Sequence, residues 1–153
     1  APIFSFLAGM SYRLWIDSLE RKGKSDREIS RASIRRGFFL FGIGFAFNIL
    51  VWLPDDTFNW DILTLIGVGY FSLNLARKLP TSVILFFCVM VFAITPVLKA
   101  TADYDSYWTQ GYFDPEMNLP DVVLGFLATG YFPIFPWIIY PLIGYVVSRF
   151  LFI

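Results

Sequence analysis

Residues 81–98 read TSVILFFCVMVFAITPVL, an apolar run of 18 residues without a charged side chain. As an α-helix, which rises about 1.5 Å per residue, this run would be about 27 Å long, close to the thickness of the hydrocarbon core of a bilayer. Helices of soluble domains normally keep one polar face toward water, and this run has none. The run therefore predicts a membrane-spanning helix, and Pro96 near its end predicts a kink or a helix end.

The rest of the chain has the composition of a membrane protein. Hydrophobic residues make up 57% and aromatic residues 20% of the 153 residues, and the mean hydropathy is +0.62. These values lie far outside the range of soluble domains. Further apolar runs lie near residues 1–16, 37–53, 61–76 and 134–153. We therefore expect an all-α integral membrane protein with about five transmembrane helices, forming one transmembrane domain over residues 1–153 and contacting lipid and other transmembrane helices of the same or a partner protein.

Several kinds of site are excluded because the chain contains no His and only one Cys, Cys88. Without His there is no Ser-His-Asp triad, no Cys-His dyad, no usual zinc site and no haem held by His, and a single Cys forms no internal disulfide. The 12 basic residues balance the 12 acidic ones, whereas nucleic-acid binding needs a basic surface. We expect no metal, no bound cofactor and no nucleic acid.

Basic residues are concentrated on one side of the expected membrane. Seven of them lie between residues 17 and 36, and Arg77 and Lys78 lie in the next loop on that side. With Arg13 and Arg149, eleven of the twelve basic residues share this side, against Lys99 on the other. By the positive-inside rule this side is cytoplasmic, so we expect the N-terminus outside and the C-terminus in the cytoplasm.

Within the basic segment, Ser25 and Glu28 have the spacing of a capping box, which predicts a helix over residues 26–36 that runs into the second span. Arg31, Arg35 and Arg36 are at helical spacing on it. One interpretation is an interfacial helix held by anionic headgroups. The other is a phosphate site for a nucleotide-like cofactor that enters from the cytoplasm.

In the second span, Gly42 and Ala46 have a small-xxx-small spacing that predicts close helix packing, as do the glycines at 67 and 69 in the third span. Asn48 is costly to expose to lipid, so we expect it to join helices or to bind substrate. The pattern GxG at residues 67–69 lacks the third glycine and the preceding strand of a dinucleotide site.

The turn that follows holds Asp55, Asp56 and Asp61. These residues do not have the glycine-spaced ligand series of an EF-hand, so a solvated turn with Asp61 at a helix N-terminus is favoured over a cation site or a general base. Phe58 and Trp60 are expected in the aromatic belt at the membrane surface.

The loop from Lys99 to Pro120 places Tyr104, Tyr107 and Trp108 among acidic residues. This composition fits a headgroup belt or docking surface, and it also fits a sugar-binding surface that combines ring stacking with carboxylate hydrogen bonds.

Residues 121–129 are too short to span a bilayer, which predicts an interfacial or re-entrant helix followed by a corner marked by prolines. Irregular backbone at membrane depth is tolerated only under a cover of protein or in a water-filled cavity, so Pro133, Pro136 and Trp137 are expected to border a pocket.

The order of motifs along the chain resembles one family, the bacterial branch of the transmembrane acyltransferases related to heparan-alpha-glucosaminide N-acetyltransferase. The resemblance covers essentially the whole chain. Each motif alone is weak evidence for the family, whereas their order along the chain is moderately specific to it. The motifs are Pro2-Ile-Phe-Ser-Phe-Leu-Ala-Gly-Met-Ser11, Arg35-Arg36-Gly37 after the basic loop, Trp60-Asp61-Ile62-Leu63 with Ile66-Gly67, and Phe132-Pro-Ile-Phe-Pro-Trp137 with Leu142-Ile-Gly144.

The resemblance implies a multi-span enzyme of the bacterial cytoplasmic (inner) membrane that transfers an acyl group from cytoplasmic acyl-CoA to a sugar hydroxyl or amine across the membrane. It would place acyl-CoA, as a co-substrate, near Arg31, Arg35 and Arg36, and the acceptor near Tyr104, Tyr107 and Trp108. In that family a span before the first motif carries an Arg-Gly signature, followed in many members by the catalytic His. This sequence has no His, so we expect a fragment of a longer protein without its catalytic span. Asp61 is then a weak candidate for the base.

Two other classes of function remain open. The chain is either such an acyltransferase or a non-catalytic accessory subunit of a larger membrane complex. A small transporter is less favoured, because the sequence has neither an internal repeat nor a charge in mid-span.

Overall fold

The computed structural model describes residues 1–52, 57–109, 112–113 and 118–153, and helices account for most of them. Short irregular elements interrupt or extend these helices: π-helical turns at Asn48–Trp52 and Gly125–Thr129, and a 3-10 turn at Tyr104–Tyr107. A two-residue antiparallel ladder joins β1 (Trp108–Thr109) to β2 (Tyr112–Phe113) and is a small departure from the expected all-α fold. The helices are α1 (Pro2–Arg21), α2 (Asp26–Phe47), α3 (Ile62–Ala76), α4 (Thr81–Thr101), α5 (Leu119–Leu124), α6 (Ile134–Trp137) and α7 (Ile139–Leu151).

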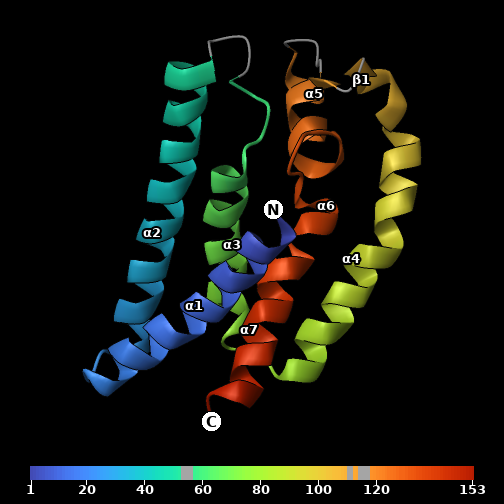
Figure 1. Ribbon diagram of the computed structural model, residues 1–153. Helices are drawn as coiled ribbons and strands as arrows, with labels where there is room; N and C mark the ends of the chain where they lie inside the picture. Colours follow the sequence, from blue (N-terminus) through green and yellow to red (C-terminus); the bar gives the residue numbers. More distant parts are fainter. Residues whose placement is uncertain (53–56, 110–111, 114–117) are drawn as a thin grey trace.

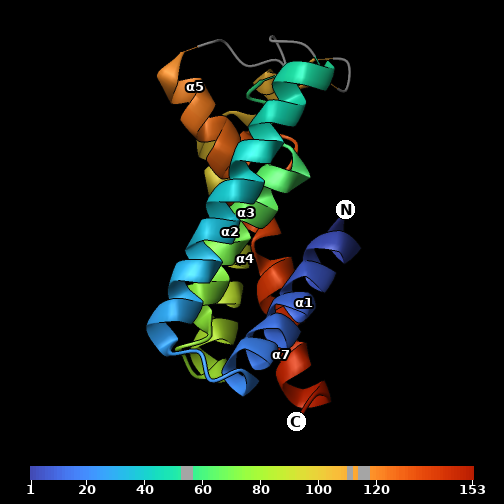
Figure 2. The same ribbon diagram turned by 90° about the vertical axis from the view of Figure 1, so that its left-hand side faces the viewer.

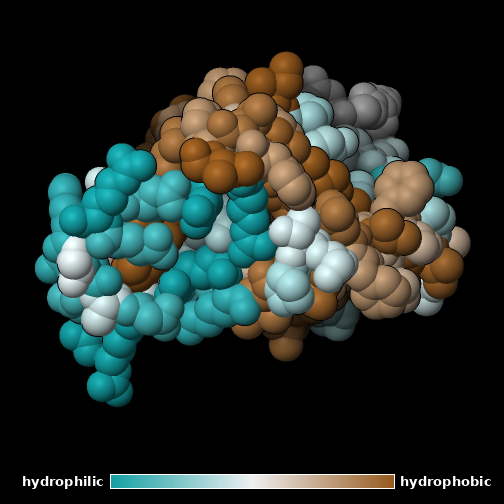
Figure 3. Space-filling model, turned by 90° about the horizontal axis from the view of Figure 1, so that it is seen from below, coloured by the Kyte–Doolittle hydropathy of each residue, from teal (hydrophilic) through white to brown (hydrophobic). Residues whose placement is uncertain are grey.

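The helices form a bundle with two chemically different ends (Figure 1). One end holds the α1–α2 connection, the α3–α4 connection and the C-terminus. We call it the basic end, because Arg21 ends α1, Lys22 and Lys24 lie in the first connection, and Arg77 and Lys78 lie in the second. Viewed from this end, hydrophilic residues gather on one side and hydrophobic residues on the other (Figure 3). We call the end that carries α5 and β1 the opposite end.

Three helical stretches are long and apolar enough to cross a membrane by length and composition: Asp26–Val51, Thr81–Thr101 and Leu119–Leu151. A fourth, Ile62–Ala76, is apolar but has only 15 residues, about 22 Å of helix. The structure thus supports a membrane protein and does not confirm five spans. α1 carries Arg13 and Asp17 and lies oblique to the bundle, with its N-terminus near mid-height (Figure 2).

The last span also differs from the prediction of a separate interfacial or re-entrant helix. From α5 through α6 to α7 the chain runs in one direction, from the opposite end to the basic end (Figure 1). It is interrupted between Thr129 and Ile134, where the helix stops and restarts. The short apolar segment is therefore the first part of a broken span.

Glycines allow α1 and α7 to pack with their backbones in contact. A Cβ atom at Gly9 would collide with the carbonyl of Pro141, and one at Gly144 would collide with the carbonyl of Phe6. Neither obstacle is a side chain that could rotate away, so any larger residue at these positions has to move a helix.

Glycines also allow close packing of α2 against α3, but at residues other than those the sequence predicts. A Cβ at Gly37 would lie 2.9 Å from the carbonyl oxygen of Gly67, and one at Gly44 would lie 2.7 Å from a methyl group of Thr64. Gly67 therefore packs closely, as predicted. The prediction for Gly42 and Ala46 is wrong, because both residues are exposed and nothing lies within 4 Å of a Cβ at Gly42.

A buried core joins α1, α3 and α7 toward the basic end. Tyr12 is fully buried, its ring lies 5.2 Å from that of Tyr70 and 6.1 Å from that of Tyr145, and its hydroxyl is 2.8 Å from Ser33 Oγ of α2. This polar contact ties α1 to α2 inside the bundle, where an unpaired hydroxyl would be costly.

We expect Gly144→Ala to lower the free energy of unfolding by about 1–3 kcal/mol, since the added methyl group forces α1 and α7 apart. Gly42→Ala is the matched control, and it should leave stability unchanged or raise it by up to about 1 kcal/mol, because Ala is the better helix former. Thermal unfolding of the purified variants in detergent measures both. Equal stability of the two variants would contradict the close α1–α7 contact.

Candidate functional site

The basic end begins with the predicted capping box. The Ser25 hydroxyl accepts a hydrogen bond from the amide of Glu28 at 3.3 Å, and the Glu28 carboxylate accepts one from the amide of Ser25 at 2.8 Å. From this cap α2 runs without interruption into its membrane-spanning part, as the sequence predicts.

Arg31, Arg35 and Arg36 all lie exposed on α2 near this end. Arg31 and Arg35 are four residues apart, so they occupy the same face of the helix. The guanidinium of Arg36 lies 4.3 Å from the centre of the Trp15 ring of α1, a cation–π contact. None of the three forms an ion pair within the part of the chain that the structure describes. Their charge is therefore available to an anion from outside.

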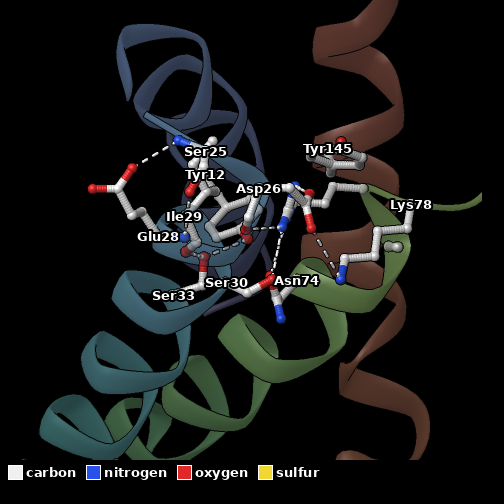
Figure 4. Close-up of polar contacts among 12 residues, drawn as sticks. Tyr12, Ser25, Asp26, Glu28, Ile29, Ser30, Ser33, Asn74, Lys78 and Tyr145 are labelled. Atoms are coloured by element: carbon white, nitrogen blue, oxygen red, sulfur yellow. Dashed lines mark hydrogen bonds and ion pairs between the residues drawn. The ribbon is translucent and has the colours of Figure 1, made fainter. Parts of the chain in front are cut away.

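Arg77, by contrast, forms hydrogen bonds within the fold, and its partners Asp26, Ser30 and Asn74 are labelled in Figure 4. Its side chain is only 7% exposed. It donates to Asp26 Oδ1 at 2.6 Å, to Ser30 Oγ at 2.7 Å and to Asn74 Oδ1 at 3.0 Å. It thereby joins the start of α2 to the end of α3, a role that the sequence does not reveal because its partners are 47 and 51 residues away.

Arg149 of α7 also forms hydrogen bonds within the fold. It donates to the carbonyl of Leu79 and to the hydroxyl of Thr81, both at 3.1 Å, and its guanidinium lies 4.8 Å from the centre of the Tyr145 ring. It also reaches the carbonyls at the end of α3, where a positive charge complements the helix dipole. Arg149 holds the α3–α4 connection against α7.

Asp61 lies before α3 and caps it. Its Oδ1 accepts a hydrogen bond from the amide of Ile62 at 2.7 Å, and its carbonyl accepts one from the hydroxyl of Thr64. Asp55 and Asp56 lie outside the described residues. Among those that the structure describes, no group of three or more potential ligands could hold a metal ion.

Asn48 is buried, with 3% of its surface exposed, at the point where α2 passes into a π-helical turn. Its amide nitrogen lies 3.4 Å from the carbonyl oxygen of Thr57. Asn48 therefore ties the end of α2 to the connection that leads into α3.

Tyr104, Tyr107 and Trp108 form a cluster at the opposite end, where each contacts another part of the protein. The Tyr104 ring lies 5.8 Å from that of Trp108 and 4.5 Å from the ammonium group of Lys99. Burial raises the pKa of Tyr104, and the negative charge of Asp105 adds to this shift. The hydroxyl of Tyr107 donates to Asp121 at 2.8 Å.

Trp108 connects this cluster to the break in the last span. Its Nε1 donates to the carbonyl of Thr129 at 3.0 Å, and its ring lies 5.0 Å from that of Tyr131. Tyr131 and Phe132 in turn donate their amides to the carbonyls of Asn59 and Trp60 at 3.3 and 3.2 Å. The irregular backbone of the break is therefore paired with the segment before α3, as burial in a membrane requires.

Pro133, Pro136 and Trp137 follow on the α6 side of the break. Pro133 is buried and Pro136 and Trp137 are half-buried. The Trp137 ring lies 5.1 Å from that of Phe132 and 5.4 Å from that of Tyr140. These contacts place the three residues around the restart of the helix.

Trp60 also does not lie where the sequence predicts. It was expected in the surface belt, yet it is only 5% exposed. Its ring lies 4.5 Å from that of Phe126 and 5.6 Å from that of Phe45. Nothing in the local sequence distinguishes a belt Trp from one covered by a segment 66 residues further along the chain.

A comparison with known protein families covers nearly the whole chain. The family model of heparan-alpha-glucosaminide N-acetyltransferase, catalytic, matches residues 1–152. The chain belongs to this family. The match confirms the relation to this family that the motifs from Pro2 to Gly144 indicate, while the bacterial branch stays a prediction, and its range includes both clusters of candidate residues. The comparisons with curated proteins and with solved structures found no match.

For a member of the N-acetyltransferase family, the two ends offer different chemistry. The basic end presents exposed guanidinium groups, which suit phosphate oxygens. The opposite end presents aromatic rings next to carboxylates and a helix break, a combination that suits a polar molecule such as a sugar through ring stacking and hydrogen bonds. The structure keeps these groups at opposite ends of the bundle (Figure 1).

We expect Arg77→Ala to lower the free energy of unfolding by about 2 kcal/mol, since a buried cation with several hydrogen bonds is lost. Lys78→Ala is the control: Lys78 also contacts Asp26, at 3.4 Å, but its side chain is 48% exposed, so the loss should stay below about 1 kcal/mol. Denaturant unfolding in detergent measures the difference. Equal losses would mean that the charge of Asp26, and not the buried network, stabilises this end.

Proposed function

We propose that the chain is part of a membrane acyltransferase that transfers an acyl group from acyl-CoA to a hydroxyl or amine of a sugar or similar acceptor. The observation that carries this proposal is the family match over residues 1–152. The match favours an enzyme over an accessory subunit. The basic end, with its exposed arginines, and the aromatic opposite end supply the two kinds of surface that such a reaction needs.

In this proposal the basic end faces the cytoplasm of a bacterium, where acyl-CoA is made, and the protein lies in the inner membrane. The positive-inside rule supports this orientation. Arg31, Arg35 and Arg36 pair with the phosphates of acyl-CoA, because guanidinium groups bind phosphate oxygens through charge-assisted hydrogen bonds. The acceptor binds at the opposite end, beside Tyr104, Tyr107 and Trp108.

In the transfer step, the pantetheine chain of acyl-CoA carries the thioester away from its phosphates at the basic end and toward the acceptor, whose oxygen or nitrogen attacks the thioester carbonyl carbon. The new carbon–oxygen or carbon–nitrogen bond forms as the carbon–sulfur bond breaks, and CoA leaves as a thiolate. A base takes the proton from the acceptor. Asp61 is the candidate base within this chain, and its position next to Trp60 and the break supports a role close to the acceptor.

We expect the double variant Arg31→Ala/Arg35→Ala to bind acetyl-CoA about tenfold more weakly, since two exposed charge contacts are worth roughly 0.5–1 kcal/mol each. Lys24→Ala/Lys78→Ala removes two charges from the same end and is the control, because these lysines already pair with Glu28 and Asp26. Equilibrium binding of labelled acetyl-CoA in detergent measures both. An equal loss in the two variants would point to general charge attraction and against a defined site.

We expect Asp61→Asn to reduce acetyl transfer at least about 100-fold, because the amide does not accept a proton. The fold should be unchanged, since Asn caps helices as well as Asp. Asp103→Asn is the control at the same end: Asp103 is exposed, its side chain makes no capping hydrogen bond to the 3-10 turn that follows, and it has no role in the proposed step. Transfer of labelled acetyl groups to glucosamine measures both variants. Full activity of Asp61→Asn would remove Asp61 as the base.

A further inference from the structure

We infer that the break in the last span binds a hydroxyl group of a sugar, through Nε1 of Trp60 and the hydroxyl of Thr129. The class of ligand rests on the proposed function, while the site itself rests on the unpaired polar atoms described next. Neither residue belongs to the aromatic cluster that sequence reasoning selected for the acceptor.

Both atoms are buried without a hydrogen-bond partner. Thr129 is fully buried and Trp60 is 5% exposed, and Oγ1 of Thr129 and Nε1 of Trp60 have no partner in the described part of the chain. Most buried polar side-chain atoms in proteins do have one, and an unpaired group needs an explanation such as a missing ligand or water. Two such groups at one helix break point to a shared partner.

The two side chains lie beside the same residue, Gly130. A Cβ atom at Gly130 would lie 2.7 Å from Cδ1 of Trp60, the carbon bonded to Nε1. Thr129 is the preceding residue, and its carbonyl accepts a hydrogen bond from Nε1 of Trp108. The amide of Phe132 pairs with the carbonyl of Trp60 at 3.2 Å. Trp60 and Thr129 thus both adjoin a glycine that leaves no room for a larger residue.

The backbone of Trp60 is strained at this point. Its φ of 57° lies in the left-handed region, which residues other than glycine rarely adopt and bulky residues least of all. Strained backbone persists only where the surrounding structure fixes it, and it is concentrated at functional sites. Strain and two unpaired polar atoms within one contact region are difficult to explain by packing alone.

The hydrogen-bonding capacity of the pair narrows the ligand to a group that both accepts and donates. Nε1 of Trp60 only donates, whereas the hydroxyl of Thr129 donates and accepts. A sugar hydroxyl accepts from Trp60 and donates to Thr129, so it satisfies both. An ammonium group has no lone pair for Trp60, and a carboxylate would bring a buried negative charge that neither Trp60 nor Thr129 neutralises.

Both atoms are enclosed in this conformation, so the sugar enters as the break moves. Residues 130–133 lie outside any helix, and they can shift at lower cost than the helical turns on either side. A residue that remains unpaired until its ligand arrives reduces the stability of the free protein, as binding sites often do.

The test is Thr129→Val, which keeps the shape of the side chain and removes the hydroxyl. Without ligand, the variant should unfold at the same or a higher temperature than the wild type, because an unpaired buried hydroxyl is lost. Glucosamine should raise the unfolding temperature of the wild type and not that of the variant, and the KM for glucosamine in acetyl transfer should rise about fivefold to tenfold. Acetyl-CoA binding should be unchanged.

Thr95→Val is the matched control, because the Thr95 hydroxyl is buried but already bonded to the carbonyl of Val91. Its KM should stay at the wild-type value. Trp60→Phe is the second variant, which removes Nε1 and keeps an aromatic ring, and it should show the same loss of glucosamine response if Thr129→Val does not fold.

The outcomes separate this inference from the proposed function. A glucosamine response lost in Thr129→Val, in a protein that transfers no acetyl group, would support the site and overturn the proposed reaction. Acetyl transfer with an unchanged KM in Thr129→Val and Trp60→Phe would overturn the site and leave the reaction standing. A wild type that glucosamine does not stabilise would also overturn the site.

Discussion

The hydrocarbon core of a membrane supplies no hydrogen-bond partners, and the rest of this structure depends on that constraint. A backbone amide or carbonyl at membrane depth has to be paired within the protein. α2 and α4 meet the requirement with uninterrupted helix. The last span does not, and its break occurs where the carbonyls of Asn59 and Trp60 can accept the amides of Tyr131 and Phe132. The segment before α3 and the break therefore form one unit.

At the basic end, the arginines that lie within the bundle are likewise paired with acceptors of the protein. Arg77 and Arg149 are buried or half-buried, and each is surrounded by acceptors from two other elements. They set the positions of the α3–α4 connection and the start of α2. The arginines of α2 that lack such partners are the exposed ones, Arg31, Arg35 and Arg36. Burial thus divides the cations of this end into those that hold the fold and those open to an anion.

The sequence predicts features that depend on neighbouring residues, and it fails where distant segments decide. The apolar run at 81–98, the capping box at Ser25 and the helix-capping role of Asp61 are local, and the structure contains all three. The spacing of Gly42 and Ala46 also looks decisive, yet α3 packs against Gly37 and Gly44 instead. A pattern of small residues shows that a face is smooth, but not which face a partner will use. The buried position of Trp60 depends on Phe126, which no local rule connects to it.

The same limit explains why the candidate site was only partly predicted. Aromatic and acidic residues in the loop at Tyr104–Trp108 pointed to the opposite end, because their composition is unusual. The unpaired atoms of Trp60 and Thr129 have no compositional signal, since a Trp and a Thr in apolar sequence normally belong to a core. What distinguishes them is a missing partner, which only a three-dimensional arrangement reveals. Four buried side-chain polar atoms of the described residues have no partner: Ser5 Oγ and Arg13 Nε belong to α1, whereas Trp60 Nε1 and Thr129 Oγ1 belong to residues that adjoin one glycine, Gly130. A ligand that both donates and accepts would complete the pair at Gly130.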